Sequence, residues 1–129
     1  VVPGLLESAT EIPRVAKLRF SAAVEILQHV QRLNETRAEP IRQICLAGIE
    51  THVCVLQTAL ELLGSGLQVF TAADATGSRF EGDRQLGLQR MSAAGVQIAA
   101  AESLAFEWCG TAEHPRFREL SQLVRHRGY

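Results

Sequence analysis

The amino-acid sequence predicts an α/β fold of three layers, in which helices cover both faces of a parallel β-sheet. Three short apolar runs alternate with helical segments, and this alternation is typical of βαβ units. The chain has 129 residues, of which 47% are apolar, so it is long enough for one sizeable core. We therefore expect residues 1–129 to form a single α/β domain.

The first half of the chain predicts a loop, a helix, a strand and a second helix. Residues 1–16 show no clean period and carry two prolines and a glycine, which indicates a loop or crossover segment. Apolar residues recur at helical spacing over residues 21–34. Residues 41–47 form a short apolar run that stops at Gly48 and predicts a buried strand. Residues 52–63 carry two apolar stripes, so this helix should be largely buried.

The next segment predicts a strand, a helix and a third strand. Residues 67–73 are apolar and predict a strand that Asp74 ends, with the Asp74 side chain organising the following turn. Residues 78–81 have the S-x-x-E form of a capping box, which predicts the start of a helix that ends before Gly95. Residues 96–100 predict the third strand.

The end of the chain predicts two further helices and a solvated tail. The first is short and covers residues 102–109. The second is predicted to begin at His114-Pro115, because proline fits the first turn of a helix. Its expected apolar face consists of Phe117, Leu120, Leu123 and Val124. His126 and Arg127 are predicted to belong to the tail.

Composition argues against several classes of function. The formal net charge of −1 offers no strong field to phosphate backbones or anionic lipid, so we expect no nucleic-acid partner. No apolar run reaches the roughly 18 residues of a membrane span, so no membrane insertion is expected. The chain begins with Val1 and shows no recognisable targeting segment, which leaves a cytoplasmic and a mitochondrial location both open.

The cysteines and the lysine are the candidate reactive residues. The three cysteines are an odd number without a C-x-x-C pair, which argues against both a disulfide framework and a structural zinc site. Cys45 and Cys109 are interpreted as core thiols. Lys17 is the only lysine among thirteen basic Lys and Arg residues, and unlike arginine it can be tuned to lose its proton.

Cys54 occupies the most informative stretch of the sequence. Residues 48–55 run from the end of a predicted strand into the start of a helix, where ligands bind in open α/β sheets. A cysteine in the first turn of a helix lies beside N–H groups and the positive end of the helix dipole, which favour thiolate over thiol. The other interpretation is a small buried hydrophobic residue. His52 is a weak metal candidate without a second ligand at helical spacing, and we expect no metal.

Several motifs resemble the isochorismatase-like cysteine hydrolases, a superfamily that includes nicotinamidases. The resemblance is carried by KLRFS (17–21), GIETHVCV (48–55), ADA (73–75), SR (78–79), RM (90–91), AG (94–95), ES (102–103) and HPRF (114–117). It covers almost the whole chain and implies an isochorismatase-like, Rossmann-like three-layer fold. It also implies that the protein hydrolyses an amide or similar bond of a small molecule through a cysteine thiolate.

The resemblance further implies roles for particular residues. Members of the superfamily use an Asp, Lys and Cys triad, in which Cys54 matches the nucleophile and Lys17 the lysine. The backbone amides of Glu50 and Cys54 match the oxyanion hole, and the family's cis peptide would join Ile49 to Glu50. Phe20 and His52 are candidate residues of the substrate pocket. No cofactor is expected.

The chain departs from the family pattern at the triad aspartate. Only sixteen residues precede Lys17, and their carboxylates are Glu7 and Glu11, not aspartates. We therefore expect a domain that lacks its N-terminal part and its first strands, which would leave one edge of the strand at residues 41–47 open. The alternative function is a catalytically inactive structural subunit of a larger assembly. Association into a homo-oligomer or a larger complex is expected under either hypothesis.

Overall fold

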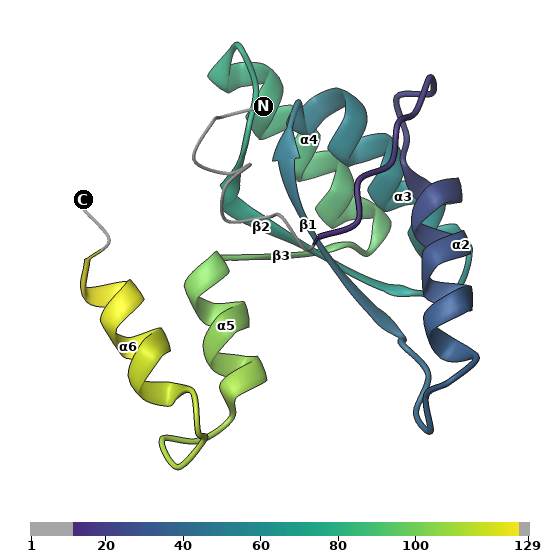
Figure 1. The fold of residues 1–129 in the computed structure, drawn as a ribbon. Coiled ribbons are helices and arrows are strands. Elements are labelled where there is room, and N and C mark those ends of the chain that lie inside the picture. Colours follow the sequence, from purple (N-terminus) through teal and green to yellow (C-terminus); the bar gives the residue numbers. More distant parts are fainter. Residues whose placement is uncertain (1–11, 127–129) are drawn as a thin grey trace.

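A three-stranded parallel sheet organises the protein, in a computed structural model that describes residues 12–126. The strands β1 (Gln43–Ile49), β2 (Gln68–Gly77) and β3 (Gln97–Ala99) lie in that order (Figure 1). The helical elements are α2 (Ala23–Asn34), η1 (Thr51–Val55), α3 (Leu56–Gly64), α4 (Glu81–Ala94), α5 (Ala101–Cys109) and α6 (Phe117–Arg125). Parallel neighbours require crossover connections, and α3 and α4 provide them. The predicted α/β class with a parallel sheet is confirmed.

The helices form two groups around the sheet. α2 packs on α3, α3 packs on α4, and both α3 and α4 contact β2. α5 contacts β2 and α6, and these two helices stand apart from the other three (Figure 1). The predicted loop over residues 1–16 lies outside the described residues up to residue 11, and residues 12–16 belong to no helix or strand.

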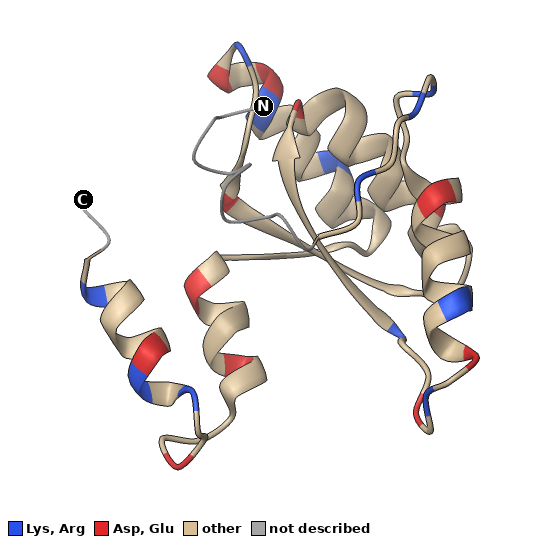
Figure 2. Ribbon diagram, viewed as in Figure 1, with Lys and Arg blue, Asp and Glu red and all other residues tan. Residues whose placement is uncertain are grey.

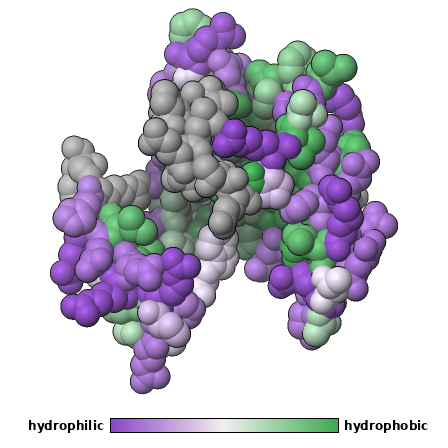
Figure 3. Space-filling view, viewed as in Figure 1, coloured by the Kyte–Doolittle hydropathy of each residue, from purple (hydrophilic) through white to green (hydrophobic). Residues whose placement is uncertain are grey.

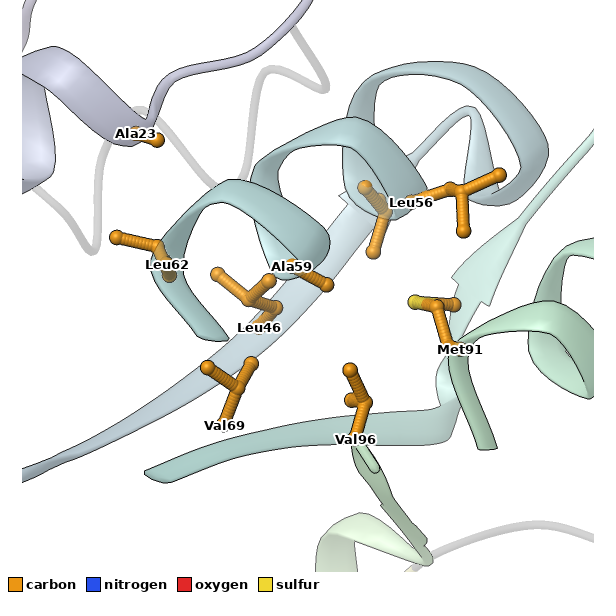
Figure 4. Close-up of a cluster of buried hydrophobic side chains, with 9 residues drawn as sticks. Ala23, Leu46, Leu56, Ala59, Leu62, Val69, Met91 and Val96 are labelled. Atoms are coloured by element: carbon orange, nitrogen blue, oxygen red, sulfur yellow. The ribbon is translucent and has the colours of Figure 1, made fainter. Parts of the chain in front are cut away.

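The hydrophobic core lies between the sheet and the group of α2, α3 and α4 (Figure 4). The sheet contributes one buried residue from β1 and one from β2. Three buried residues of α3 pack against them, because the apolar stripes of this helix face the strands. The core residues are Ala23, Leu46, Val55, Leu56, Ala59, Leu62, Val69, Met91 and Val96. Burying one valine or leucine side chain stabilises a fold by about 1.5–3 kcal/mol, so this cluster holds the strands and helices around the β1–α3 junction together.

The surface carries both hydrophilic and hydrophobic residues. Figure 3 shows most of the hydrophobic surface of this face over the part of the molecule that holds α2 and α3, and mainly hydrophilic surface over α6. Within the described residues, no helix is long and apolar enough to span a bilayer.

Strand β2 is longer than the sequence predicted. Its register against β1 shifts between Leu46, which pairs with Thr71, and Gly48, which pairs with Thr76. The last residues of β2 therefore run beside the end of β1 instead of forming a turn. The predicted role of Asp74 is wrong, because Asp74 lies inside β2 and its Oδ1 accepts a hydrogen bond of 2.7 Å from the N–H of Ala101, at the start of α5.

The predicted capping box of α4 is also wrong. Phe80 is the N-cap residue, and no side chain caps the helix there. Ser78 instead places its Oγ 3.0 Å from Nδ1 of His52. The predicted end of the helix is correct: Gly95 has a φ of 106°, a left-handed conformation that glycine adopts without a side-chain penalty.

The last helix begins later than predicted and stays exposed. His114-Pro115 belongs to a turn in which the carbonyl of His114 accepts a hydrogen bond of 2.9 Å from the N–H of Phe117, the first residue of α6. α6 buries none of its residues, and Leu123 on its apolar face is 73% exposed. The apolar face lines a groove with Ala101 and Ala105 of α5.

Candidate active site

The junction between β1 and α3 forms the centre of the candidate site. β1 ends at Ile49, and a cis peptide bond joins Ile49 to Glu50, as the resemblance implied. η1 then makes one turn of π-helix over Thr51–Val55 and continues directly into α3. π-helical turns occur often at functional sites. Cys54 lies in this first turn, half-buried, where the sequence predicted it.

Hydrogen bonds to Glu50 shape the turn that carries Cys54. The carbonyl oxygen of Glu50 accepts bonds of 3.2 Å from both the N–H of Val53 and the N–H of Val55. The backbone of Glu50 itself is extended, with a φ of −89° and a ψ of 140°. The N–H groups at the start of a helix concentrate positive potential, so this turn suits a thiolate or an oxyanion.

Cys54 and Lys17 line the same pocket. Its volume is about 210 Å³, and it lies against β1 and the start of α2. Its lining residues are Lys17, Ala22, Ile26, Leu46, Ala47, Gly48, Ile49, Cys54, Val55 and Thr58. Phe20 and His52 are not among them, so their place in a substrate pocket remains a prediction. Among these lining residues there is no carboxylate to stand for the triad aspartate.

Two backbone carbonyls hold the ammonium group of Lys17. Its Nζ donates hydrogen bonds to the oxygen of Arg19 at 2.9 Å and to the oxygen of Phe20 at 2.6 Å. A lysine ammonium has three donors, so one N–H remains for a group in the pocket. The segment that follows Lys17 therefore bends around the ammonium group, at a pocket that Cys54 also lines.

Thr58 connects the two sides of the pocket, and sequence reasoning did not single it out. Its buried Oγ1 accepts a hydrogen bond of 2.9 Å from the N–H of Ala22 and donates one of 2.7 Å to the carbonyl of Cys54. One hydroxyl thus ties the start of α2 to the turn that carries Cys54. The pair could not be recognised in sequence, because Ala22 and Thr58 are separated by 36 positions.

A second pocket adjoins the first and contains a carboxylate. It shares Lys17, Ala22 and Ile26 with the Cys54 pocket and is also lined by Glu25. The Oε2 atom of Glu25 is buried and has no hydrogen-bond partner within the described part of the chain. Sequence reasoning missed Glu25, which occupies an ordinary position in the first turn of α2.

The end of β2 and the residues that follow it contact the turn at three successive positions, 77–79. Thr51 donates from Oγ1 to the carbonyl of Gly77 at 3.0 Å. Nδ1 of His52 lies 3.0 Å from the Oγ of Ser78. The third contact is an ion pair of 2.9 Å between Nε of Arg79 and Oε1 of Glu50. Figure 2 shows the resulting neighbourhood of acidic and basic residues where β1 ends and α4 begins.

The remaining cysteines differ from Cys54 in their surroundings. All three cysteines are free. Burial raises the pKa of Cys45 above its ordinary value near 9, against a smaller opposing effect of a hydrogen bond with the backbone of Ala72. Cys109 donates from Sγ to the carbonyl of Thr111 at 3.4 Å. The described residues contain no group of three His, Cys, Asp or Glu side chains that could hold a metal ion.

Comparison with known proteins identifies the family. Residues 5–103 match the family model described as the isochorismatase domain. The chain belongs to the isochorismatase-like hydrolase family. It is also 44% identical over 92 residues to isochorismatase domain-containing protein 2 of Bos taurus, a match that covers 70% of this chain and 45% of the cattle protein. The matches cover between 30% and 58% of the length of the curated relatives.

Solved structures of the same fold support the assignment. The structure of MAR1 ribonuclease from Caenorhabditis elegans is similar at a TM-score of 0.76 and 31% identity, over 88% of this chain and 55% of that one. The YcaC gene product of Escherichia coli, described as an octameric hydrolase of unknown specificity, gives a TM-score of 0.65 at 27% identity. That match covers 97% of this chain and 66% of the bacterial one.

Proposed function

We propose that the protein is a cysteine hydrolase that cleaves an amide or similar bond of a small molecule. The observation that carries the proposal is the pocket that Cys54 and Lys17 line together. A thiol at the start of a helix and a cation on the same pocket wall are the surroundings in which a cysteine reacts as a thiolate. Membership of a hydrolase family supports the same chemistry.

The proposed reaction proceeds through a thioester. The sulfur of Cys54 attacks the carbonyl carbon of the substrate, and the carbonyl oxygen takes the negative charge. The amides of Glu50 and Cys54 stabilise that oxyanion, and the Lys17 ammonium adds positive charge to the pocket. The carbon–nitrogen bond then breaks, and the leaving amine takes the proton that the thiol has given up. Water hydrolyses the thioester to a carboxylic acid and restores the thiol.

The lining of the pocket favours a mainly apolar substrate. Most of its wall is aliphatic, and the charged group on it is Lys17. We therefore propose a mainly apolar amide or a related compound with one reactive carbonyl carbon.

Amide turnover tests the proposal. The protein is incubated with a panel of small primary amides, and ammonia release is followed beyond one equivalent per chain. We expect turnover with at least one amide, and we expect the Cys54→Ala variant to lose it by at least about 1,000-fold, because the nucleophile is removed.

The matched control is Cys109→Ala, which removes a thiol that lies outside the pocket. It should retain activity within about twofold. Turnover that survives in Cys54→Ala, or loss of turnover in Cys109→Ala alone, would contradict the assignment of the nucleophile.

Association between chains belongs to the same proposal. In the described part of the chain, β1 is an edge strand, and its last residue, Ile49, is 77% exposed. An exposed apolar edge favours pairing with another polypeptide. We propose that the protein functions in an oligomer or a larger complex, in line with its octameric relative from Escherichia coli.

A further inference from the structure

Arg79 contacts the turn over residues 50–55 that carries Cys54, here called the nucleophile turn, but it does not line the Cys54 pocket. It lies in the short connection between the end of β2 at Gly77 and the start of α4 at Glu81. Its Nε donates to Oε1 of Glu50 at 2.9 Å. Most of the Arg79 side chain is exposed, whereas the Glu50 side chain is only 23% exposed. The ion pair therefore fixes a largely covered carboxylate from the outside.

Both the backbone carbonyl and the side-chain carboxylate of Glu50 are held by contacts. Its carbonyl oxygen accepts the N–H groups of Val53 and Val55. Its carboxylate binds Arg79 through Oε1, while Oε2 lies 3.7 Å from Nε2 of His52. The N–H belongs to the nitrogen that is bonded to the same Cα. The contacts therefore hold the Cα of Glu50 and limit how far its nitrogen can shift.

The partners of Glu50 are themselves fixed. His52 places Nδ1 against the Oγ of Ser78, and its Nε2 also lies 3.9 Å from Oδ2 of Asp83 in α4. Thr51, between Glu50 and His52, is fully buried and donates to the carbonyl of Gly77. An ion pair at a surface usually contributes little to stability, because its side chains lose entropy when it forms. That loss is smaller when neighbouring contacts already restrict the side chains.

We infer that Arg79 is a positioning residue for the oxyanion hole: through the Glu50 carboxylate, it aligns the Glu50 N–H with the negative oxygen that forms when Cys54 attacks. The inference rests on the proposed function, because it needs Cys54 as the nucleophile and the Glu50 amide as a donor. It adds a role for a residue that makes no contact with the reacting atoms.

Two reagents separate alignment of the oxyanion hole from reactivity of the thiol. With p-nitrophenyl acetate, the thiolate attacks the ester carbonyl and an oxyanion forms. p-Nitrophenolate then departs, and the cysteine is acetylated. With iodoacetamide, the thiolate displaces iodide from carbon and no oxyanion forms. A residue that acts on the oxyanion hole should change the first rate and leave the second unchanged.

The experiment measures both rates at Cys54 in the wild type and in Arg79→Gln, with the rate of Cys54→Ala subtracted. We expect Arg79→Gln to slow acetylation by about 10- to 100-fold, somewhat less than the loss of a whole oxyanion-hole donor. Alkylation should stay within about threefold. Arg79→Lys, which keeps the charge, should restore part of the acetylation rate.

Further variants control for the ion pair itself. Glu50→Gln should slow acetylation as Arg79→Gln does, and the double variant should be no slower than either, because both changes remove one interaction. Arg116→Gln is the matched control, since it breaks an exposed ion pair with Glu119 in a remote part of the chain. It should change neither rate.

The outcomes distinguish this inference from the proposed function. If the wild type acetylates Cys54 and Arg79→Gln does so equally fast, the inference is wrong and the nucleophile stands. If acetylation and alkylation fall together, Arg79 has a general structural role and the inference is also wrong. If wild-type Cys54 is acetylated no faster than the background of Cys54→Ala, the proposed function fails, and the inference with it.

Discussion

At the scale of single residues, Gly87 allows α4 to approach the nucleophile turn. A Cβ atom at Gly87 would lie 2.9 Å from the Cα and 3.1 Å from the backbone nitrogen of His52. These are backbone atoms of a turn that Gly77 and Ser78 also hold, so they cannot move aside easily. The absence of a side chain at this position is therefore part of what places Cys54.

Because Gly87 lies so close to His52, a larger side chain at this position should destabilise the protein. Gly87→Ala should lower the free energy of unfolding by about 1–2 kcal/mol, because overpacking typically costs about 1–3 kcal/mol and exceeds the gain in helix propensity. Urea unfolding of both proteins measures the difference.

Gly82→Ala provides the control in the same helix, since a Cβ at Gly82 meets nothing within 4 Å. It should stabilise the protein by up to about 1 kcal/mol, as expected for alanine in place of glycine in a helix. Equal effects of the two substitutions would show that the close approach to His52 does not matter.

Residue-level predictions from the sequence succeeded where a short motif carried them. The position of Cys54 in the first turn of a helix follows from one contiguous segment, and the cis bond before Glu50 was implied by the family resemblance of that segment; the structure has both. Thr58 and Arg79 could not be predicted in the same way. Their partners lie 36 and 29 positions away, and only tertiary packing brings them together.

At the scale of elements, the irregular end of β2 determines how the site is supported. After Thr71 the strand leaves its register with β1 and returns at Thr76. Arg84 of α4 closes this irregular stretch by donating to the carbonyls of Ala73 and Thr76. Only 22% of the Arg84 side chain is exposed, so its guanidinium is a largely buried partner of these carbonyls.

Loss of the hydrogen bonds that Arg84 donates to these carbonyls should destabilise the fold. Arg84→Met should lower the free energy of unfolding by about 2–3 kcal/mol, because hydrogen bonds to a charged group contribute about 1.5–3 kcal/mol each and part of the loss is recovered through water. Arg90→Met, at an exposed position of the same helix, should change it by less than about 0.5 kcal/mol. Thermal or urea unfolding measures both, and a loss below about 0.5 kcal/mol in Arg84→Met would refute the role of Arg84.

Element types were predictable from the sequence, whereas some boundaries were not. Hydrophobic periodicity located the helices and strands because burial of one face produces it. The strand at β2 was predicted to stop at residue 73, since Asp74 disfavours a strand in isolation. In the structure the Asp74 carboxylate instead binds the first N–H of α5, a partner 27 positions away.

At the scale of the whole molecule, the parallel sheet places the carboxyl ends of β1 and β2 side by side. The nucleophile turn follows β1, and it is contacted by Gly77 at the end of β2 and by the next two residues, Ser78 and Arg79. This is the edge of an open α/β sheet at which ligands bind. The fold agrees with the position of the pocket and follows from the alternation of strands and helices in the sequence, whereas the family assignment rests on the matched domain.

We propose that Cys54 reacts as a thiolate because Lys17 lines the same pocket. The test is the rate at which iodoacetamide alkylates each cysteine at pH 7, followed by mass spectrometry in the wild type, Lys17→Met and Lys17→Arg. Cys45 is the internal reference, because burial raises its pKa, keeps it protonated at this pH and makes it slow.

We predict that wild-type Cys54 reacts at least about tenfold faster than Cys45 and Cys109, that Lys17→Met removes most of this advantage, and that Lys17→Arg retains part of it. The Cys54 rate lost in Lys17→Met should return as the pH is raised, since hydroxide then generates the thiolate without help. Equal rates at the three cysteines, or a Cys54 rate that Lys17→Met leaves unchanged, would show that Lys17 does not activate Cys54.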